Sequence, residues 1–158
     1  MSGAGAPQFT LEQMGGIRVA IIASSWHDVV MNGLIAGAVA TCDAAGVQHV
    51  LVRVPGSFEL GVAAMRAAKS GTIDAVVALG VVIRGGTPHF EFVCTAATDA
   101  LNRVALDTGI PVGFGLLTCD TEEQALARAG LWHSNESKGQ EAAEAALITV
   151  QTLRSVGW

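Results

Sequence analysis

The chain alternates short apolar runs with longer segments in which apolar residues recur every three or four positions. Four runs rich in β-branched residues predict strands over Arg18–Ala23, Gln48–Arg53, Ala75–Val82 and Val112–Thr118. The remaining periodic segments predict helices over Val29–Ala45, Phe58–Lys69, Phe90–Thr108, Thr121–Ala129 and Ser137–Leu153. The third strand contains no polar position, which is typical of a strand buried on both faces. This alternation predicts an α/β fold in which helices cover both faces of a parallel sheet.

Residues that begin and end helices agree with this pattern. Asp120 and Glu123 predict a capping box at the fourth helix, and Gly46, Gly71 and Gly109 stand where helices should end. In parallel sheets, ligands bind beyond the carboxyl ends of the strands. The segments to search for a site are therefore Ser24–Asp28, Pro55–Glu59, Ile83–Phe90 and Cys119–Glu122.

Length and composition narrow the choice of function. We expect one domain over residues 1–158, with residues 1–15 as a flexible N-terminal arm that has no signal-peptide pattern. The chain is 51% hydrophobic and only 15% charged, which indicates either apolar surface that meets a second copy or a large core within one domain. The longest apolar run, Ala75–Ile83, is too short to cross a membrane. The net charge is −5 and the nine basic residues are scattered along the chain, so we expect no basic patch that could bind nucleic acid or an anionic membrane surface.

The three cysteines, Cys42, Cys94 and Cys119, lie far apart in the chain. Their spacing matches neither a metal site nor a disulfide framework, and it suits a reducing compartment. We therefore expect a cytoplasmic protein with no metal.

A glycine turn follows the third strand in the segment Arg84-Gly85-Gly86-Thr87-Pro88-His89-Phe90. Thr87 suits the N-cap of a helix and Pro88 its first position. The free amides and dipole at such a helix start can bind an anion, although a capped strand–helix turn without any ligand explains the same residues. His89 would lie in the first helical turn, where an imidazole can exchange protons near pH 7 or be merely structural.

Two further turns offer candidate contacts. Ser57 can cap the helix that follows the second strand, and Glu59 either complements the helix dipole or accepts hydrogen bonds from ligand hydroxyls. Trp26, beside His27, can stack on a flat heterocycle or be an ordinary rim residue. Arg128 can clamp phosphate with its planar fork, or be one more surface arginine.

Together these segments resemble the lumazine synthase family, from about Ile17 to Leu153. The most specific block is Ala78–Glu91, which contains the glycine turn and His89. Pro55–Glu59 is similar to the family's P-G-[AS]-x-E element, and Thr121–Ala125, Arg128–Gly130 and Lys138–Gly139 are similar to its C-terminal signature.

The resemblance implies a flavodoxin-like, three-layer αβα fold with a four-stranded parallel sheet. It implies a transferase of riboflavin biosynthesis that uses no cofactor and shares its active sites between neighbours in a ring of five. The reaction would condense 5-amino-6-(D-ribitylamino)uracil with 3,4-dihydroxy-2-butanone 4-phosphate, releasing phosphate and two waters. Riboflavin synthase is then a candidate partner.

The resemblance also assigns roles to residues. Trp26 would stack on the pyrimidine and His27 would flank it, while main-chain groups at Val81, Val82 and Ile83 read the pyrimidine edge. The ribityl chain would meet Gly56, Ser57, Phe58 and Glu59. The phosphate would be held by Gly86, Thr87 and the neighbour's Arg128. His89 would carry protons, and Phe114 and Lys138 from the neighbour would close the site.

Two other functions stay open on the sequence alone: a storage protein that binds flavin or lumazine, and an archaeal-type riboflavin synthase. The segment Ala129–Ser137 looks longer than its counterpart in relatives that assemble into shells. We therefore expect isolated rings, with a shell-forming compartment protein as the alternative.

Overall fold

Four parallel strands form one sheet in the order β2-β1-β3-β4 in the computed structural model, which describes residues 10–158. The strands are β1 (Arg18–Ser24), β2 (Gln48–Val54), β3 (Ala75–Ile83) and β4 (Val112–Cys119). The helical elements are α1 (Asp28–Ala44), the 3-10 turn η1 (Ser57–Glu59), α2 (Leu60–Ala68), α3 (His89–Thr108), α4 (Glu122–Leu126) and α5 (Lys138–Ser155). The predicted α/β fold with a four-stranded parallel sheet is confirmed.

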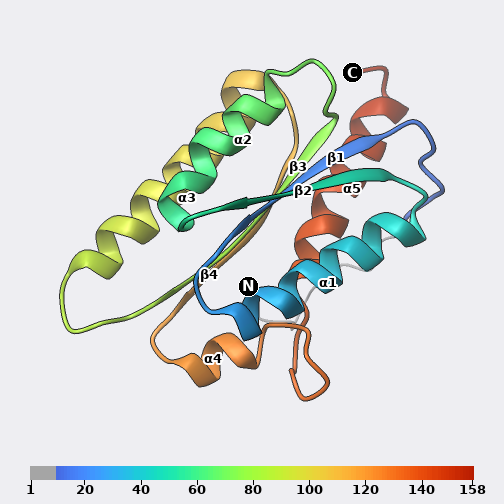
Figure 1. Cartoon of the computed structure of the whole chain (residues 1–158). Helices are drawn as coiled ribbons and strands as arrows, with labels where there is room; N and C mark the ends of the chain where they lie inside the picture. Colours follow the sequence, from blue (N-terminus) through green and yellow to red (C-terminus); the bar gives the residue numbers. More distant parts are fainter. Residues whose placement is uncertain (1–9) are drawn as a thin grey trace.

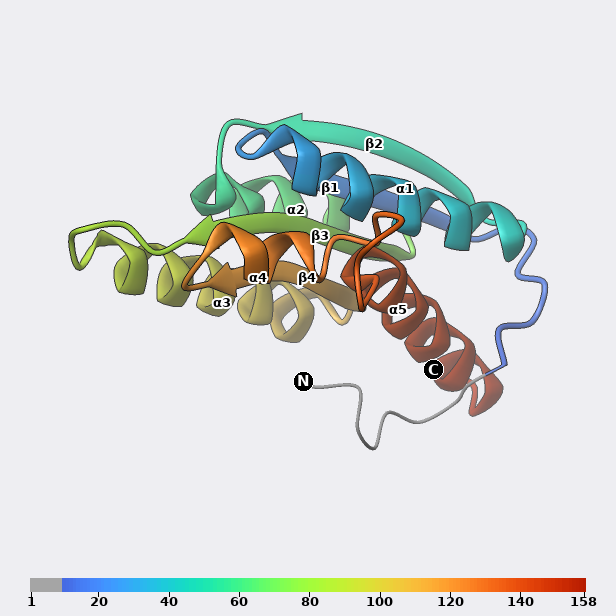
Figure 2. The same ribbon diagram turned by 90° about the horizontal axis from the view of Figure 1, so that it is seen from below.

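Helices cover both faces of the sheet, with α2 and α3 on one side and α1 and α5 on the other (Figure 1). The view from below shows β2 and β4 at opposite edges (Figure 2). Successive residues of β1 pack alternately into two hydrophobic cores, one on each face of the sheet. Ile21 packs in the cluster with Leu34 of α1, whereas Ile22 packs in the cluster with Leu60 of α2. This is why β1 reads as a continuous apolar run.

Each strand begins at its predicted residue and runs one residue past its predicted end. α3 ends at its predicted residue, and α1 and α2 each end one residue before theirs. The glycines that follow these ends, Gly46, Gly71 and Gly109, all have positive φ, the left-handed conformation that glycine adopts without strain. β2 differs from the other strands in being largely exposed, whereas β4 at the opposite edge is largely buried.

The predicted start of α4 was wrong by one residue. Thr121, not Asp120, is the N-cap: its backbone is extended, and its hydroxyl accepts a hydrogen bond from the Gln124 amide. The Asp120 amide instead donates to Gln124 Oε1 at 2.9 Å. The helix also ends at Leu126, short of the predicted Ala129, because Ala129 pairs with Ser137 in an antiparallel bridge.

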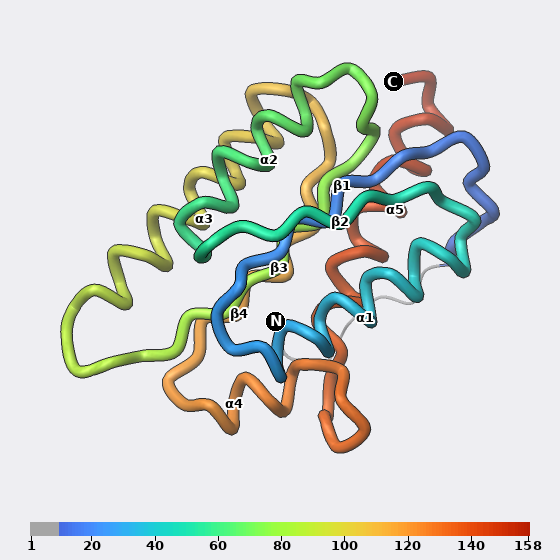
Figure 3. Tube along the Cα trace, in the orientation of Figure 1, coloured from blue at the N-terminus to red at the C-terminus, as the bar shows by residue number. Residues whose placement is uncertain are grey.

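That bridge closes a loop between α4 and α5, which stands out from the end of the molecule that carries α4 (Figure 3). At its base the Lys138 amide donates to the Arg128 carbonyl at 3.0 Å. Near its tip, the Trp132 side chain is 92% exposed and its ring contacts that of His133 edge-on. Ser134, Asn135 and Glu136 also hydrogen-bond back to Leu126 and Ala127, so the loop is held along much of its length and Trp132 and His133 form its exposed tip.

The predicted N-terminal arm covers residues 1–15, of which residues 1–9 lie outside the described part. Met14 is buried in the core, and its amide donates to the Ala45 carbonyl at 2.8 Å. Within residues 10–158, no helix combines the length and apolar character needed to cross a membrane.

Candidate functional site

A cavity of about 340 Å³ opens where the turns after β1, β2 and β3 meet, at the carboxyl edge of the sheet. This is the edge at which the sequence predicted a ligand site. The lining residues come from all three turns and from α3: Trp26, His27, Gly56, Ser57, Phe58, Glu59, Val81, Val82, Ile83, His89 and Val93. Ten of these eleven were predicted. Val93 was missed, although it lies one helical turn after His89 and so shares its face.

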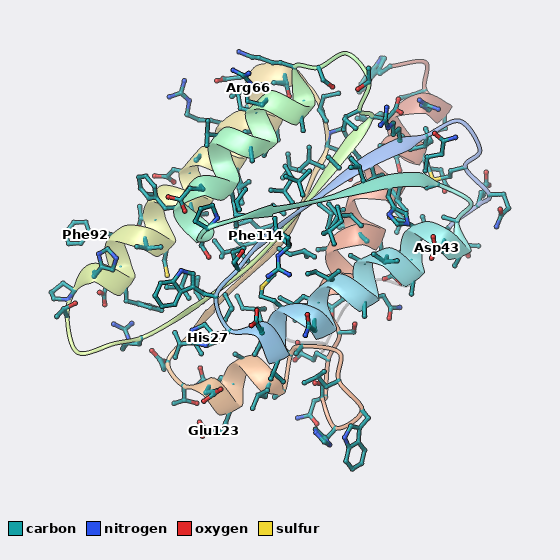
Figure 4. All side chains as sticks on the ribbon, viewed as in Figure 1. His27, Asp43, Arg66, Phe92, Phe114 and Glu123 are labelled. Carbon is teal, nitrogen blue, oxygen red and sulfur yellow. The ribbon has the colours of Figure 1, made fainter. Side chains whose placement is uncertain are left out.

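The turn after β1 presents Trp26 and His27 to this cavity. His27 is the one residue other than glycine with positive φ (59°) in the part of the chain that the structure describes. Its carbonyl accepts the first hydrogen bond of α1, from the Met31 amide at 3.0 Å. Left-handed backbone at such a residue is uncommon and costs about 1–3 kcal/mol, which suits a site where side-chain direction matters. Figure 4 shows His27 at the carboxyl end of the sheet.

The turn after β2 places Gly56 close to the side chains of both Glu59 and Trp26. A methyl group placed on Gly56 would lie 3.1 Å from Glu59 Oε2 and 3.7 Å from Trp26 Nε1. Gly56 therefore leaves room for two side chains that line the cavity.

Ser57 does not cap a helix as predicted. Gly56 is the N-cap residue of η1, and no side chain caps that turn. Ser57 is buried, with its hydroxyl facing Gly80 of β3: a methyl group on Gly80 would lie 2.8 Å from Ser57 Oγ. The serine thus belongs to the floor of the cavity.

The glycine turn after β3 forms a second hollow beside the first, lined by Arg84, Gly85, Gly86, Thr87, Pro88 and Glu91. Gly86 and Thr87 lie here, and the next residue but one, His89, lines the main cavity. The predicted cap by Thr87 was wrong: Pro88 is the cap residue, with helical φ and ψ, and it has no side chain that could accept a hydrogen bond. His89 does begin α3, as predicted within the first turn.

Arg84 was not predicted to have a role, yet it has the most interactions around the glycine turn. Its Nε donates to Asp120 Oδ1 at 2.7 Å, its Nη1 donates to Glu91 Oε1, and the guanidinium lies 4.2 Å from the centre of the Phe90 ring. The hydrogen bond to Asp120, then that to Glu91, raises the pKa of Arg84, and the bond from Arg84 lowers the pKa of Glu91. Asp120 lies 36 positions away in sequence, so no local signal could have revealed this pairing.

Three predicted site residues line neither of these hollows. Phe114 of β4 is 48% exposed and lies in a separate hollow with residues of α3. Arg128 and Lys138 lie together at the base of the loop between α4 and α5, and Arg128 Nη1 donates to the Gln124 carbonyl at 2.9 Å. The structure thus groups the candidates into a cavity set and an outlying set.

Lys138 is held by two carboxylates at this loop base. Its amine lies 2.6 Å from Glu136 Oε2 and 2.7 Å from Glu141 Oε2. Burial acts to lower the pKa of Lys138, but hydrogen bonds to the two carboxylates outweigh burial and keep the pKa above its ordinary value. Lys138 therefore stays a cation.

No group of His, Cys, Asp and Glu side chains within residues 10–158 is arranged to hold a metal ion. The three thiols are free, and burial raises the pKa of each of them, that of Cys42 to about 11. At neutral pH they are protonated and poor nucleophiles. The polar side chains that line the cavity, Ser57, Glu59 and His89 among them, can orient bound groups and take part in proton transfer.

The chain is similar to known proteins over nearly its whole length. The family model described as 6,7-dimethyl-8-ribityllumazine synthase matches residues 16–154. A protein of that name from Streptomyces avermitilis is 58% identical over 157 residues, which are 99% of this chain and 97% of that protein. The proteins of the same name from Leifsonia xyli and Kocuria rhizophila are 60% and 61% identical, covering 99% and 97% of this chain and 99% of each relative.

Proposed function

Because the chain belongs to the 6,7-dimethyl-8-ribityllumazine synthase family, we propose that it makes that compound. The substrates are 5-amino-6-(D-ribitylamino)uracil and 3,4-dihydroxy-2-butanone 4-phosphate, and the reaction releases phosphate and two waters. The main support is that ten residues chosen from sequence as contacts for these substrates line one cavity. That cavity adjoins a glycine turn suited to phosphate.

The uracil occupies the main cavity. Trp26, whose side chain is 68% exposed, offers an open indole face for stacking on the pyrimidine. Backbone groups of Val81, Val82 and Ile83, where β3 ends, read the edge of the ring. Glu59 accepts hydrogen bonds from ribityl hydroxyls, and Phe58 covers the chain.

The phosphate binds at the glycine turn, through the amides of Gly86 and Thr87 and the first turn of α3. The charges beside this turn argue that another cation is needed. Arg84 is paired with both Glu91 and Asp120, so the three together carry one formal negative charge. We assign the missing positive charge to Arg128 of the neighbouring subunit, since Arg128 of the same chain does not line this hollow.

His89 carries protons during the reaction. Imine formation and ring closure each release one water, and phosphate leaves by elimination between them, so several protons must move within one cavity. His89 lines that cavity next to the phosphate turn, within reach of both substrates. Holding the two substrates together supplies much of the acceleration, so no covalent nucleophile is required.

The active assembly is a ring of five. Large apolar side chains remain exposed on one subunit, including Phe92 and Leu106 of α3 and Phe114 of β4. Figure 4 shows Phe92 pointing outward from α3. Burial of these exposed apolar side chains between subunits would bring Phe114 and Lys138 to the neighbour's site. The ring stays single because the exposed Trp132 loop obstructs ring-to-ring contacts. We place the enzyme in the cytoplasm, with riboflavin synthase as a candidate partner.

Steady-state turnover with both substrates, followed by lumazine absorbance, tests the proposal. We expect lumazine formation to depend on both substrates, and phosphate to be released in equal amount. A protein that forms no lumazine but binds flavin or lumazine tightly is a storage protein, and one that instead consumes two lumazines is a riboflavin synthase. Either result would overturn the proposal.

A further inference from the structure

The glycine turn is not held in place by packing. Residues Gly85 to His89 are all exposed, and a methyl group placed on Gly85 or on Gly86 would meet no atom within 4 Å. A loop with so few contacts has many accessible conformations, and each costs affinity if a ligand must first select one. Something other than packing must therefore keep its amides aligned.

Arg84 spans this turn from its first residue to the helix beyond it. Its amide donates to the Cys119 carbonyl at 2.9 Å, which extends the β3–β4 pairing past Ile83. Its guanidinium holds Glu91 and lies over Phe90, both in the first turn of α3. The two ends of the loop are thus joined by one planar, rigid group.

The same guanidinium reaches the turn that leads to Arg128. Asp120 accepts from Arg84 Nε, and the Asp120 amide donates to Gln124 Oε1 at 2.9 Å. The Gln124 carbonyl in turn accepts from Arg128 Nη1, also at 2.9 Å. A continuous series of hydrogen bonds therefore connects the glycine turn with the outlying arginine.

Stability does not account for this arrangement. The Arg84 side chain is 43% exposed and its two carboxylate partners are more exposed still. Exposed ion pairs contribute only about 0–1 kcal/mol each, whereas a planar guanidinium that holds two groups fixes their relative geometry.

We propose that Arg84 is a positioning residue for phosphate recognition, which braces the glycine turn and ties it to the turn carrying Arg128. The inference rests on the proposed function for the identity of the ligand. In this proposal Arg84 does not itself bind the phosphate: its Nε and Nη1 each donate to a carboxylate, and those carboxylates would repel a dianion.

Substitution of the two carboxylate partners distinguishes a positioning role of Arg84 from direct contact between Arg84 and the phosphate. Arg84→Gln, Glu91→Gln and Asp120→Asn should each raise the KM for the butanone phosphate about fivefold to tenfold, and the inhibition constant of inorganic phosphate with it, while the KM for the uracil changes less than twofold. Combining Arg84→Gln with Asp120→Asn should add little to either alone. Arg84→Lys, which keeps the charge without the fork, should restore only part of the affinity. If Glu91→Gln and Asp120→Asn instead lower that KM, Arg84 binds phosphate itself and the proposal fails.

Amide hydrogen exchange in the first turns of α3, over residues 91–95, tests the bracing without any turnover, since these amides are hydrogen-bonded and Arg84 holds Glu91 at their start. Arg84→Gln should speed exchange there about tenfold, because the start of the helix loses that restraint. Arg103→Gln is the matched control. It removes the ion pair between Arg103 and Asp107 of α3, in which the arginine is more exposed than Arg84, and it should leave exchange and both KM values unchanged. Unchanged exchange in Arg84→Gln overturns the inference even if the wild type turns over. Absent turnover in a wild type whose exchange still depends on Arg84 refutes only the proposed function.

Discussion

Gly56→Ala should weaken uracil binding without unfolding the protein. The backbone at Gly56 is extended (φ −146°, ψ −178°), so alanine fits the conformation without strain. The new methyl group would lie 3.1 Å from Glu59 Oε2, tighter than an ordinary contact, and the carboxylate must shift by a few tenths of an ångström. A hydrogen bond to a charged group contributes about 1.5–3 kcal/mol. Losing roughly a third to a half of that from Glu59 corresponds to about a fivefold rise in the KM for the uracil.

Steady-state kinetics at saturating butanone phosphate would measure this effect, with thermal or denaturant unfolding measured alongside. We expect kcat and the KM for the butanone phosphate to stay within about twofold, because the lost contact belongs to uracil binding in the ground and transition states alike. The free energy of unfolding should change by less than about 1 kcal/mol, since alanine also restricts the unfolded chain. Gly15→Ala, at an exposed position with no neighbour within 4 Å, is the control.

Glu59→Gln checks the route by which Gly56→Ala acts. If the methyl group works by displacing Glu59, the double variant should bind the uracil no more weakly than Glu59→Gln alone, because the two changes remove one interaction. Additive losses, or an unchanged KM for the uracil in Gly56→Ala, would refute the reasoning.

Four further outcomes are expected. His89→Ala should slow turnover by about 10²-fold or less, because water can replace the imidazole, and complete loss in a correctly assembled variant would contradict a role limited to proton transfer. Arg128→Ala should raise the KM for the butanone phosphate more than that for the uracil. Arg128→Ala subunits, mixed with His89→Ala subunits and reassembled, should regain activity at sites that take intact His89 from one chain and intact Arg128 from its neighbour. Confirmed mixed rings that stay inactive would rule out shared sites. Trp26→Phe should remove most of the fluorescence quenching by uracil or lumazine, and persistent quenching would assign it to Trp132 or Trp158. Light scattering should find five chains of 16.2 kDa, about 81 kDa; about 972 kDa would mean a closed shell of sixty, and twice the smaller mass two stacked rings.

The sequence was most informative where burial dictates residue type. β3 was placed within one residue because both of its faces pack against helices, so only apolar residues are tolerated. Helix caps were predicted less well. Whether Asp120 or Thr121 caps α4 depends on backbone angles at the turn, and both residues are good caps in isolation.

The site also contains residues whose positions the sequence could predict and residues whose positions it could not. Trp26, Ser57 and His89 follow strands of one parallel sheet, so the order of elements along the chain already predicts that they converge. The role of Arg84 could not be predicted, because its distant partner Asp120 is brought to it only by the pairing of β4 with β3. The distance of Arg128 from the cavity likewise follows only from the fold of a single subunit.

The closed base of the loop between α4 and α5 makes its outer part a place where length is free to vary. The pairing of Ala129 with Ser137, and the bond from the Lys138 amide to the Arg128 carbonyl, fix the backbone at both cations, and the nearby Glu136 holds the Lys138 amine. Lengthening a flexible loop costs only about 0.6 kcal/mol per doubling. Insertions at Trp132 should therefore lower stability little and leave catalysis intact. They offer a way to alter the outer surface, whether in evolution or by grafting a peptide epitope.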